Sequence, residues 1–404
     1  MEQESFKNPF RPGAGHRPPY LAGRTAEQDE MKQYLDQRLV TQNVILTGLR
    51  GVGKTVLLET VKPIAMEAGW LWAGADMSES ASVTEDNLAL RILTDIAPVT
   101  AALAIAEKKH LPPGFLSVEE TMRQPLDFGL LNAIYRQEPG LVSDKLKSVL
   151  TFVWTMLSGT TKGIVFAYDE AQNLADHAAK SQYPLALLLE VFQSLQRKGI
   201  PFLLVLTGLP TLLPKLIESR TYSERMFHVI SLKQLDEQAS REAIMKPIED
   251  AQCPVRFTEE VVETICRLSG GYPYFIQFIC KEIYDIWVAK AVSGREVSDV
   301  PITDIVMKLD NDFFQGRWAR VTDRQKELLK AIVALPTCDD EFTVQEIVGA
   351  SRMLLEKAFS GSHVTQMMSS LSNQGLVFKN RHGKYSLAVP LLAAFIRRQY
   401  DSIG

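Results

Sequence analysis

The clearest chemical pattern in this sequence is a glycine-rich run of eight residues: Gly48, Leu49, Arg50, Gly51, Val52, Gly53, Lys54 and Thr55. It matches G-x-x-x-x-G-K-[S/T], and its glycines allow successive backbone N–H groups to point at phosphate oxygens. A helix that begins at Lys54 would add the positive end of its dipole. In this pattern the lysine contacts the β- and γ-phosphates, and the Thr55 hydroxyl ligates Mg²⁺. The run, together with Val56, therefore predicts a site for ATP and Mg²⁺, with a purely structural turn as the alternative.

A pair of carboxylates forms the second pattern, in the segment FAYDEAQNL from Phe166 to Leu174. An apolar strand that ends at Asp169 would place this carboxylate where it can hold the Mg²⁺ shell. Glu170 could then polarise the water that attacks ATP. An Asp-Glu pair after a strand also serves as a helix N-cap, so its catalytic interpretation depends on the glycine-rich run.

Two further positions could complete a hydrolytic site. Thr207 ends the apolar segment PFLLVLTG, where its hydroxyl could bind the γ-phosphate or the water, or else satisfy the local backbone. Arg225 follows in RTYSERMFHVISL and could reach the nucleotide of a neighbouring subunit as an arginine finger. A solvated surface arginine is the alternative, and Arg220 competes for the same role.

The elements that must position these residues alternate between strands and helices. An extended arm at residues 1–19 and a helix at about 25–39 precede a short β-branched strand at 44–48 and the helix after the glycine-rich run. Further strands are expected in WLWAGADM and at 163–169 and 201–208, with a long helical stretch at about 84–157 that is broken by Pro112, Pro113 and Gly140. Apolar strands separated by helices predict an α/β fold with a parallel sheet covered on both faces.

The remainder of the chain predicts two smaller parts. From about Asp236 to Val288 the pattern is purely helical. After about Thr322 several short helices precede two strands around the turn Arg381-His382-Gly383, an order that indicates a winged helix.

Composition limits the alternatives. With 46% hydrophobic and 23% charged residues, the chain is typical of a globular protein. The four cysteines form no C-x-x-C pair and the N-terminus lacks an apolar core, so we expect a cytoplasmic protein. The net charge is −4, but residues 301–404 carry +2, which makes them the only plausible face for nucleic acid.

With these residues in place, the chain resembles the AAA+ and STAND superfamily of P-loop ATPases. More narrowly it resembles bacterial relatives of origin-recognition-complex ATPases and of transposition-regulator ATPases. The matching segments are PPYLAGR (18–24), which implies adenine contact and includes Tyr20; GLRGVGKT and DEAQ (169–172) as Walker A and B; Thr207 as sensor 1; SER (223–225) as the finger; and SGGYPYFIQ (269–277) as the lid.

The lid segment departs from the pattern of many AAA+ proteins, because it reads Gly270-Gly271-Tyr272-Pro273-Tyr274 and lacks the sensor-2 arginine. Gly-x-Pro resembles the STAND branch, which implies that Pro273 contacts the nucleotide. Slow turnover, with ATP acting as a conformational switch, then becomes more plausible.

The C-terminal segment resembles the winged helix of origin-recognition-type ATPases. Its recognition helix would run from about 363 to 373, with Val364, Met367, Met368 and Leu371 in the core by their helical spacing. The residues expected to contact DNA are Thr365 and Gln366 of this helix and Lys379, Arg381 and Lys384 of the wing. Docking to another protein is the alternative use of the same module.

The expected domains are an arm with the adenine-side segment over 1–24, an ATPase domain over 25–235 with a helical insertion at about 84–157, a helical lid over 236–300 and a winged helix over 301–404. The expected function is ATP binding and hydrolysis in an ATP-controlled homo-oligomer that acts on DNA. A STAND-type signalling or defence switch, whose winged helix contacts only proteins such as an effector, is the alternative.

Overall fold

The structure, a computed structural model, describes residues 7–13, 15–37, 39–102, 104–108, 121–251, 253, 256–293, 300–381 and 383–401. The chain divides into two compact units. The sheet unit contains residues 26–47 and 57–231. The lid unit contains residues 1–25, 48–56 and 232–404, and therefore includes the glycine-rich run, here called the phosphate loop.

The sheet unit is built on a parallel sheet of five strands in the order β2-β5-β6-β1-β7. The strands are β1 (Asn43–Thr47), β2 (Trp70–Ala73), β5 (Gly163–Tyr168), β6 (Phe202–Gly208) and β7 (Phe227–Ser231). The central strands β5 and β6 are buried along their whole length, as their continuous apolar sequences predict. The predicted parallel sheet is thus confirmed, while β7 is an additional strand that the sequence did not indicate.

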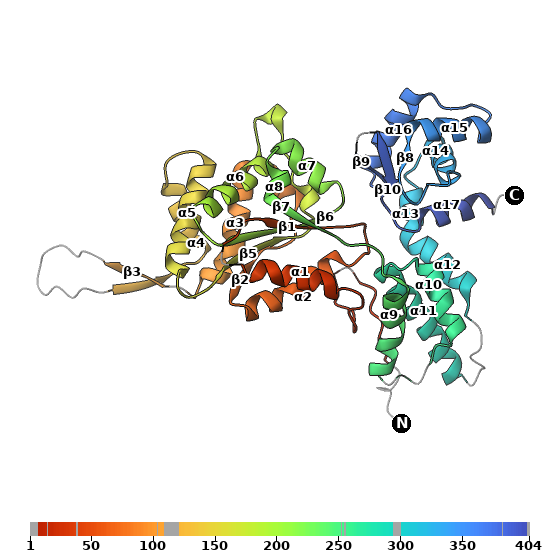
Figure 1. Ribbon diagram of the computed structural model, residues 1–404, viewed down its shortest axis with the longest axis horizontal. Coiled ribbons are helices and arrows are strands. Elements are labelled where there is room, and N and C mark those ends of the chain that lie inside the picture. Colours follow the sequence, from red (N-terminus) through yellow and green to blue (C-terminus); the bar gives the residue numbers. More distant parts are fainter. Residues whose placement is uncertain are drawn as a thin grey trace, which may run out of the picture. The chain divides into compact units, whose positions relative to one another are not determined.

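Helices cover both faces of this sheet (Figure 1). The chain runs from β1 through α2 (Lys54–Glu67) to β2 at one edge, whereas the later connections step back in the opposite direction. Right-handed crossovers therefore place α2 on the face opposite to α3 (Glu85–Thr100), α5 (Val142–Leu157) and α6 (Pro184–Arg197). Helix α1 (Thr25–Leu35) contacts His228 through Glu30 and Tyr34. His228 pairs in register with Val44, and the next residue of β1, Ile45, points into the core on the α3 face. His228 therefore points to the other face, so α1 lies on the same face as α2.

The α3 face holds the main core of the sheet unit. Ile45, Phe166 and Leu206 point into it, together with apolar residues of α3, α5 and α6. The Phe166 ring packs edge-on against Phe192 at 5.0 Å and against Phe202 at 5.3 Å. The shorter helices of this unit are α4 (Phe128–Gln137), α7 (Leu212–Ser219), α8 (Ser223–Met226), η2 (Glu79–Ser82), η3 (Ala171–Asn173) and η4 (Ala178–Lys180).

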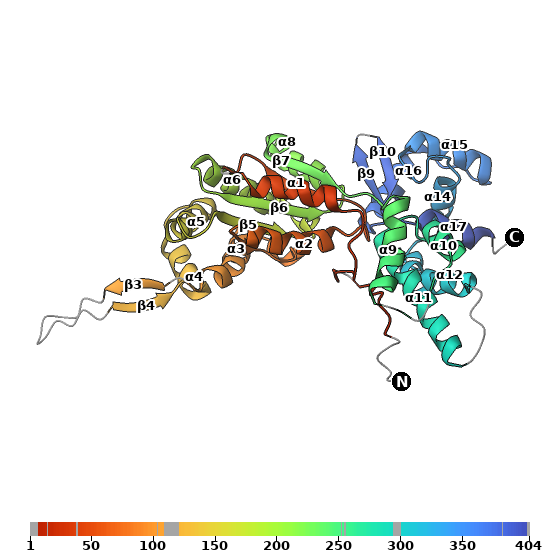
Figure 2. The ribbon, with the colours of Figure 1, turned by 60° about the horizontal axis from the view of Figure 1, so that its bottom comes forward.

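The stretch at 84–157, expected to be helical, also contains a β-hairpin, so that expectation was wrong in part. Strands β3 (Ala104–Lys108) and β4 (Thr121–Pro125) pair antiparallel between α3 and α4 (Figure 2). The residues between the two strands lie outside the described part of the chain. Their sequence includes Pro112 and Pro113, which cannot continue a helix.

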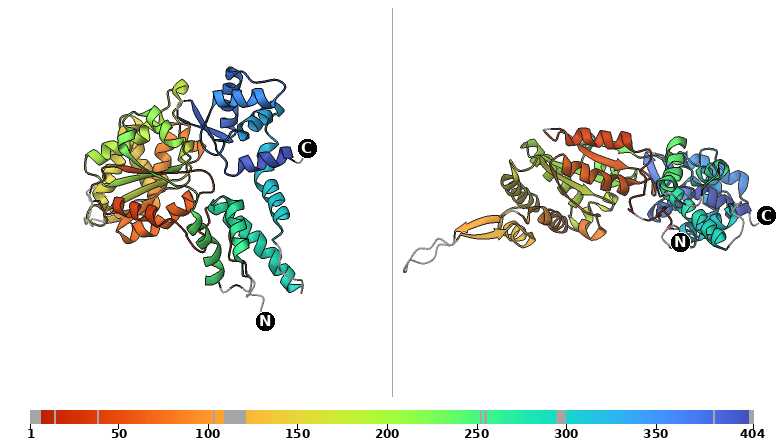
Figure 3. Two further views of the ribbon diagram at one scale, coloured as in Figure 1. Left: turned by 45° about the vertical axis from the view of Figure 1, so that its right-hand side comes forward. Right: turned by 90° about the horizontal axis from the view of Figure 1, so that it is seen from below.

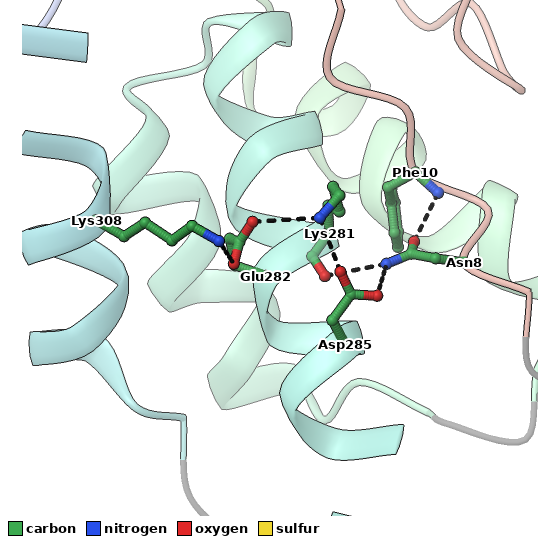
Figure 4. A network of polar contacts seen from close by, with 6 residues as sticks. All are labelled: Asn8, Phe10, Lys281, Glu282, Asp285 and Lys308. Atoms are coloured by element: carbon green, nitrogen blue, oxygen red, sulfur yellow. Dashed lines mark hydrogen bonds and ion pairs between the residues drawn. The ribbon is translucent and has the colours of Figure 1, made fainter. Parts of the chain in front are cut away.

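In the lid unit, three helices pack around one apolar core: α9 (Glu237–Asp250), α10 (Glu259–Ser269) and α11 (Pro273–Val292). Residues 7–24, here called the arm, form no helix or strand in their described part and run along these helices. Phe10 is buried and its ring stacks on Phe257. The Asn8 amide donates to the Lys281 carbonyl at 3.0 Å and to Asp285 at 2.7 Å (Figure 4).

A helical connection leads from the lid helices to the C-terminal part of this unit (Figure 3, cyan). It consists of α12 (Ile302–Leu309), the π-helical η5 (Asp310–Gln315) and α13 (Gly316–Trp318). Lys308 of α12 forms an ion pair with Glu282 of α11 at 2.6 Å and so fixes the connection to the lid (Figure 4).

The C-terminal part has the element order of a winged helix. It consists of α14 (Asp323–Val333), β8 (Phe342–Thr343), α15 (Val344–Leu354), α16 (Gly361–Asn373), β9 (Val377–Arg381), β10 (Lys384–Leu387) and α17 (Leu392–Asp401). The three strands form a sheet in the order β8-β10-β9, with both pairings antiparallel. Helix α16 is the predicted recognition helix and its expected core positions, Val364, Met367, Met368 and Leu371, are buried. Across the described residues, no helix is both long and apolar enough to span a bilayer.

Candidate nucleotide-binding and hydrolysis site

The phosphate loop joins β1 directly to the first turn of α2, as its sequence predicts. Gly51 and Gly53 have φ angles of 77° and 96°, in the left-handed region that glycine adopts without strain. The Lys54 ammonium donates to the carbonyls of Gly48 at 2.9 Å and Leu49 at 3.0 Å. The loop therefore curls around a cation at the N-terminus of a helix, which is the arrangement that binds phosphate.

The arm supports the phosphate loop from within the lid unit. Arg24 is only 5% exposed, and its guanidinium donates to the carbonyls of Val52 at 3.0 Å and Lys233 at 2.7 Å. A side chain at Gly15 would place its Cβ 3.2 Å from the Thr55 methyl group, so the arm passes directly over this residue. Tyr20, predicted to contact adenine, donates its hydroxyl to Glu242 of α9 at 3.3 Å.

The start of the lid helix α11 also contacts the phosphate loop. Pro273 is the first residue of this helix, and the next residue, Tyr274, donates its backbone N–H to the Gly51 carbonyl at 3.2 Å. The Tyr274 ring packs against Phe313 of η5 with 5.5 Å between centroids. The lid segment that resembles the STAND pattern is thus held against the loop by a backbone hydrogen bond.

Asp169 follows β5 at the carboxyl edge of the sheet, where it is 5% exposed. Its backbone pairs with the segment after β2, through Asp169 N–H to Ala75 O at 3.3 Å and Met77 N–H to Asp169 O at 2.8 Å. This close crossing requires Gly74, because a Cβ there would lie 1.8 Å from the Ala167 carbonyl oxygen. The β2 end therefore fixes the position of the predicted Mg²⁺ ligand.

Glu170 adopts a left-handed backbone, with φ 51° and ψ 32°. Such a conformation is unfavourable for a residue with a side chain and is concentrated at functional sites. Glu170 precedes the short helix η3 but makes no side-chain cap hydrogen bond, so the helix-capping alternative does not describe this carboxylate. Its side chain is exposed and accepts a hydrogen bond from Gln172. Gln172 in turn accepts from the Leu209 N–H at 3.2 Å, which links the ends of β5 and β6.

Thr207 lies near the end of β6, the strand between β5 and β1. It pairs in register with Leu46 and points to the face that α2 covers, because the preceding Leu206 points into the opposite core. Its side chain is 0% exposed, and its hydroxyl has no hydrogen-bond partner among the described residues. A buried hydroxyl without a partner is unusual enough to need an explanation. The alternative prediction, a hydrogen bond from the Thr207 hydroxyl to the local backbone, is not seen among the described residues.

The two candidate fingers differ in their surroundings. Arg225 lies in α8 with an exposed side chain, and it forms no ion pair within the described part of the chain. Arg220 is half-buried and donates to the Ser219 carbonyl at 3.5 Å. Its charge and hydrogen bond also lower the pKa of the Tyr222 hydroxyl, against a larger increase caused by burial. Of the two, Arg225 is therefore the more exposed to solvent.

The predicted DNA contacts of the winged helix lie on two elements. Thr365 and Gln366 are exposed on α16, opposite its buried side, and Lys379 is exposed on β9. Lys384 begins β10, and its backbone pairs with Arg381 at the end of β9. The Arg381 side chain and the whole of His382 lie outside the described part of the structure.

Comparison with known proteins agrees with this architecture. Residues 311–396 match the model of a domain of unknown function, DUF8462. No curated protein sequence matches the chain. Among solved structures, the Walker-type ATPase PABY2304 of Pyrococcus abyssi is 17% identical, with 96% of this chain and 98% of that chain covered and a TM-score of 0.58.

The ADP form of the Aeropyrum pernix ORC2 protein is a second similar structure, 14% identical, with coverage of 96% and 95% and a TM-score of 0.54. At these identities the similarity concerns the fold. The chain thus has the fold of Walker-type, AAA+-like ATPases, and the resemblance predicted from the sequence is confirmed at that level.

Proposed function

We propose that this chain binds ATP with Mg²⁺ at residues 48–56 and hydrolyses it slowly. The observation that carries this proposal is that the segments with the three predicted groups leave neighbouring strands at one edge of the sheet. The phosphate loop continues β1, Thr207 lies near the end of the neighbouring β6, and Asp169 follows β5 next to it. Because parallel strands end at the same edge, this is where ligands of open α/β sheets bind.

Each side chain has a defined part in this proposal. Lys54 neutralises the β- and γ-phosphates, while Thr55 and Asp169 supply the hard oxygen ligands that Mg²⁺ prefers. When bound, Mg²⁺ would neutralise charge that develops on the phosphate oxygens. Glu170 accepts a proton from the attacking water, and Thr207 donates its free hydroxyl to the water or to the terminal phosphate.

The absence of an arginine at the start of α11 supports slow turnover. The described first turn of this helix contains Pro273, Tyr274 and Phe275, none of which can neutralise a phosphate. Arg225 then supplies a cation from a second subunit, as arginine fingers do. We therefore propose a homo-oligomer whose nucleotide sites are completed between subunits.

DNA is the proposed partner of the winged helix. Lys379, Arg381 and Lys384 are three basic residues in the sequence of the β9–β10 hairpin, within a C-terminal segment of net charge +2. A signalling switch whose winged helix contacts only protein is the second candidate. It is favoured by the exposed side of α16, where Thr365 and Gln366 carry no charge to attract phosphate.

The test is ATP turnover by the full chain with and without duplex DNA, together with its mass in ATP and in ADP. We expect turnover that DNA stimulates and a larger assembly in ATP. Lys54→Ala should abolish ATP binding without loss of the fold, because it removes the cation inside the phosphate loop. Tight ATP binding by folded Lys54→Ala would refute the site assignment, whereas turnover independent of DNA would favour the signalling switch.

A further inference from the structure

The carboxylate of Glu170 has one hydrogen-bond donor within the described part of the chain, the side-chain amide of Gln172. The left-handed backbone at Glu170 turns the chain out of β5, and the short helix η3 follows at once. The Glu170 side chain is exposed, so packing does not restrict its rotamers. The Gln172 amide is therefore the group that restricts the direction of the proposed general base.

The orientation of the Gln172 amide is determined at its other end. Its Oε1 accepts a hydrogen bond from the Leu209 N–H at 3.2 Å. A backbone N–H can only donate and an ionised carboxylate can only accept, so the amide nitrogen must face Glu170. A glutamine offers one acceptor and one donor group for this purpose, whereas a glutamate of the same length offers only acceptors. The residue type at position 172 thus matches both of the groups that it joins.

Three further features hold Gln172 itself in place. Lys215 of α7 donates its ammonium to the Gln172 carbonyl at 2.7 Å. Burial lowers the pKa of Lys215, because it removes water from the ammonium, and the Gln172 carbonyl replaces part of that hydration. Gly208 allows the amide to approach β6 closely, since a Cβ there would lie 2.7 Å from Gln172 Oε1. Ala171, the preceding residue, is 0% exposed in the core. Gln172 is therefore anchored to β6, to α7 and, through its neighbour, to the core.

We propose that Gln172 is a positioning residue, which holds the Glu170 carboxylate in the direction from which it accepts the proton of the attacking water. This inference rests on the proposed hydrolysis of ATP. The Gln172 amide exchanges no proton in this role. Its contribution is orientation, because a base that is held in one direction by rigid neighbours does not have to be ordered during the reaction.

Two variants at this position separate positioning from a purely structural link between β5 and β6. Gln172→Glu keeps an acceptor for the Leu209 N–H at the same length, but replaces the donor to Glu170 by a second carboxylate. Gln172→Met removes both hydrogen bonds and adds no charge. The loss of a hydrogen bond to a charged group corresponds to roughly 10- to 100-fold in rate. In the full chain we expect both variants to lose about 10-fold or more in single-turnover hydrolysis, with Mg-ATP affinity within about twofold of wild type.

Combination with Glu170→Gln gives a readout that a structural role would not change. No carboxylate then remains to be positioned, so Gln172→Met should alter the residual single-turnover rate by less than about twofold. Gln182→Met is the matched control, because the half-buried Gln182 also accepts a backbone N–H through its side-chain oxygen, from Glu85 at 3.0 Å. Its turnover should stay within about twofold of wild type.

Normal hydrolysis by Gln172→Glu would overturn the proposal, because the contact with Leu209 would then be sufficient. An equal loss from Gln172→Met with and without Glu170→Gln would also overturn it, as would a parallel loss of Mg-ATP affinity. Loss of activity in Glu170→Gln together with normal Gln172 variants rejects the positioning role alone. If the wild-type chain does not hydrolyse ATP, or Glu170→Gln is as active as wild type, the proposed function fails and this inference fails with it.

Discussion

The free hydroxyl of Thr207 allows a test in which stability and activity change in opposite directions. An unsatisfied buried polar group costs about 1–3 kcal/mol, and Thr207→Val removes the hydroxyl while keeping a β-branched side chain in the strand. We therefore expect the free energy of unfolding of the sheet unit to increase by about 1 kcal/mol. The same substitution removes a donor to the terminal phosphate or the water, so turnover should fall by about 10-fold or more.

The free energy of unfolding is measured by urea titration, from the shift of the unfolding midpoint at an unchanged m-value. Turnover is measured in the steady state at saturating Mg-ATP. Thr47→Val is the matched control. The Thr47 hydroxyl is also buried without a partner in the described structure, on the neighbouring strand β1. Its register partner is Gly208, one residue beyond Thr207, so its side chain points to the opposite face of the sheet.

Thr47→Val should therefore gain a similar stability and change turnover by less than about twofold. The reasoning is refuted if Thr207→Val loses stability while turnover stays normal, because the hydroxyl would then be a structural hydrogen-bonding group. Equal losses of turnover in both variants would also refute it, because the effect would then not depend on the face of the sheet.

Three further predictions concern the remaining parts of the site. Glu170→Gln should retain ATP binding and lose about 10²–10⁴ in turnover, since a general base acts only on the reaction; single-turnover kinetics within twofold of wild type would place the base elsewhere. Arg225→Ala and Lys54→Ala should each be inactive alone, but a mixture should recover activity, because the finger of one subunit meets the intact loop of another; no recovery at any ratio argues against a finger in trans. Replacing both Arg381 and Lys384 by Ala should reduce the salt slope of duplex binding by roughly 2, measured by titration at several salt concentrations; an unchanged slope would exclude the wing from phosphate contact.

The central sheet could be predicted because its inner strands are buried on both faces. Strands β5 and β6 are continuous apolar runs, which is the sequence that a short strand buried on both faces of a parallel sheet has. The edge strand β7 was missed for the converse reason. Its sequence FHVIS includes the half-buried His228 and the exposed Ser231, so neither a continuous apolar run nor a strict alternation marks it.

The phosphate loop was predictable because the chemistry fixes both the residue types and their spacing. The residues that support the loop carry no comparable signal. Arg24 is 28 and 209 positions away from the two residues whose carbonyls it binds, and Tyr274 acts through its backbone N–H, which every residue except proline possesses.

The contacts of the phosphate loop also explain why it belongs to the lid unit. At three consecutive positions it contacts other segments of the unit: the Val52 carbonyl accepts from Arg24 of the arm, the Gly51 carbonyl accepts from Tyr274 of α11, and the Arg50 side chain lies near Gly375, just after α16. Three segments from distant parts of the chain therefore contact one short loop. A rearrangement of the loop would break or reshape the hydrogen bonds at Gly51 and Val52, because both depend on the position of a backbone carbonyl.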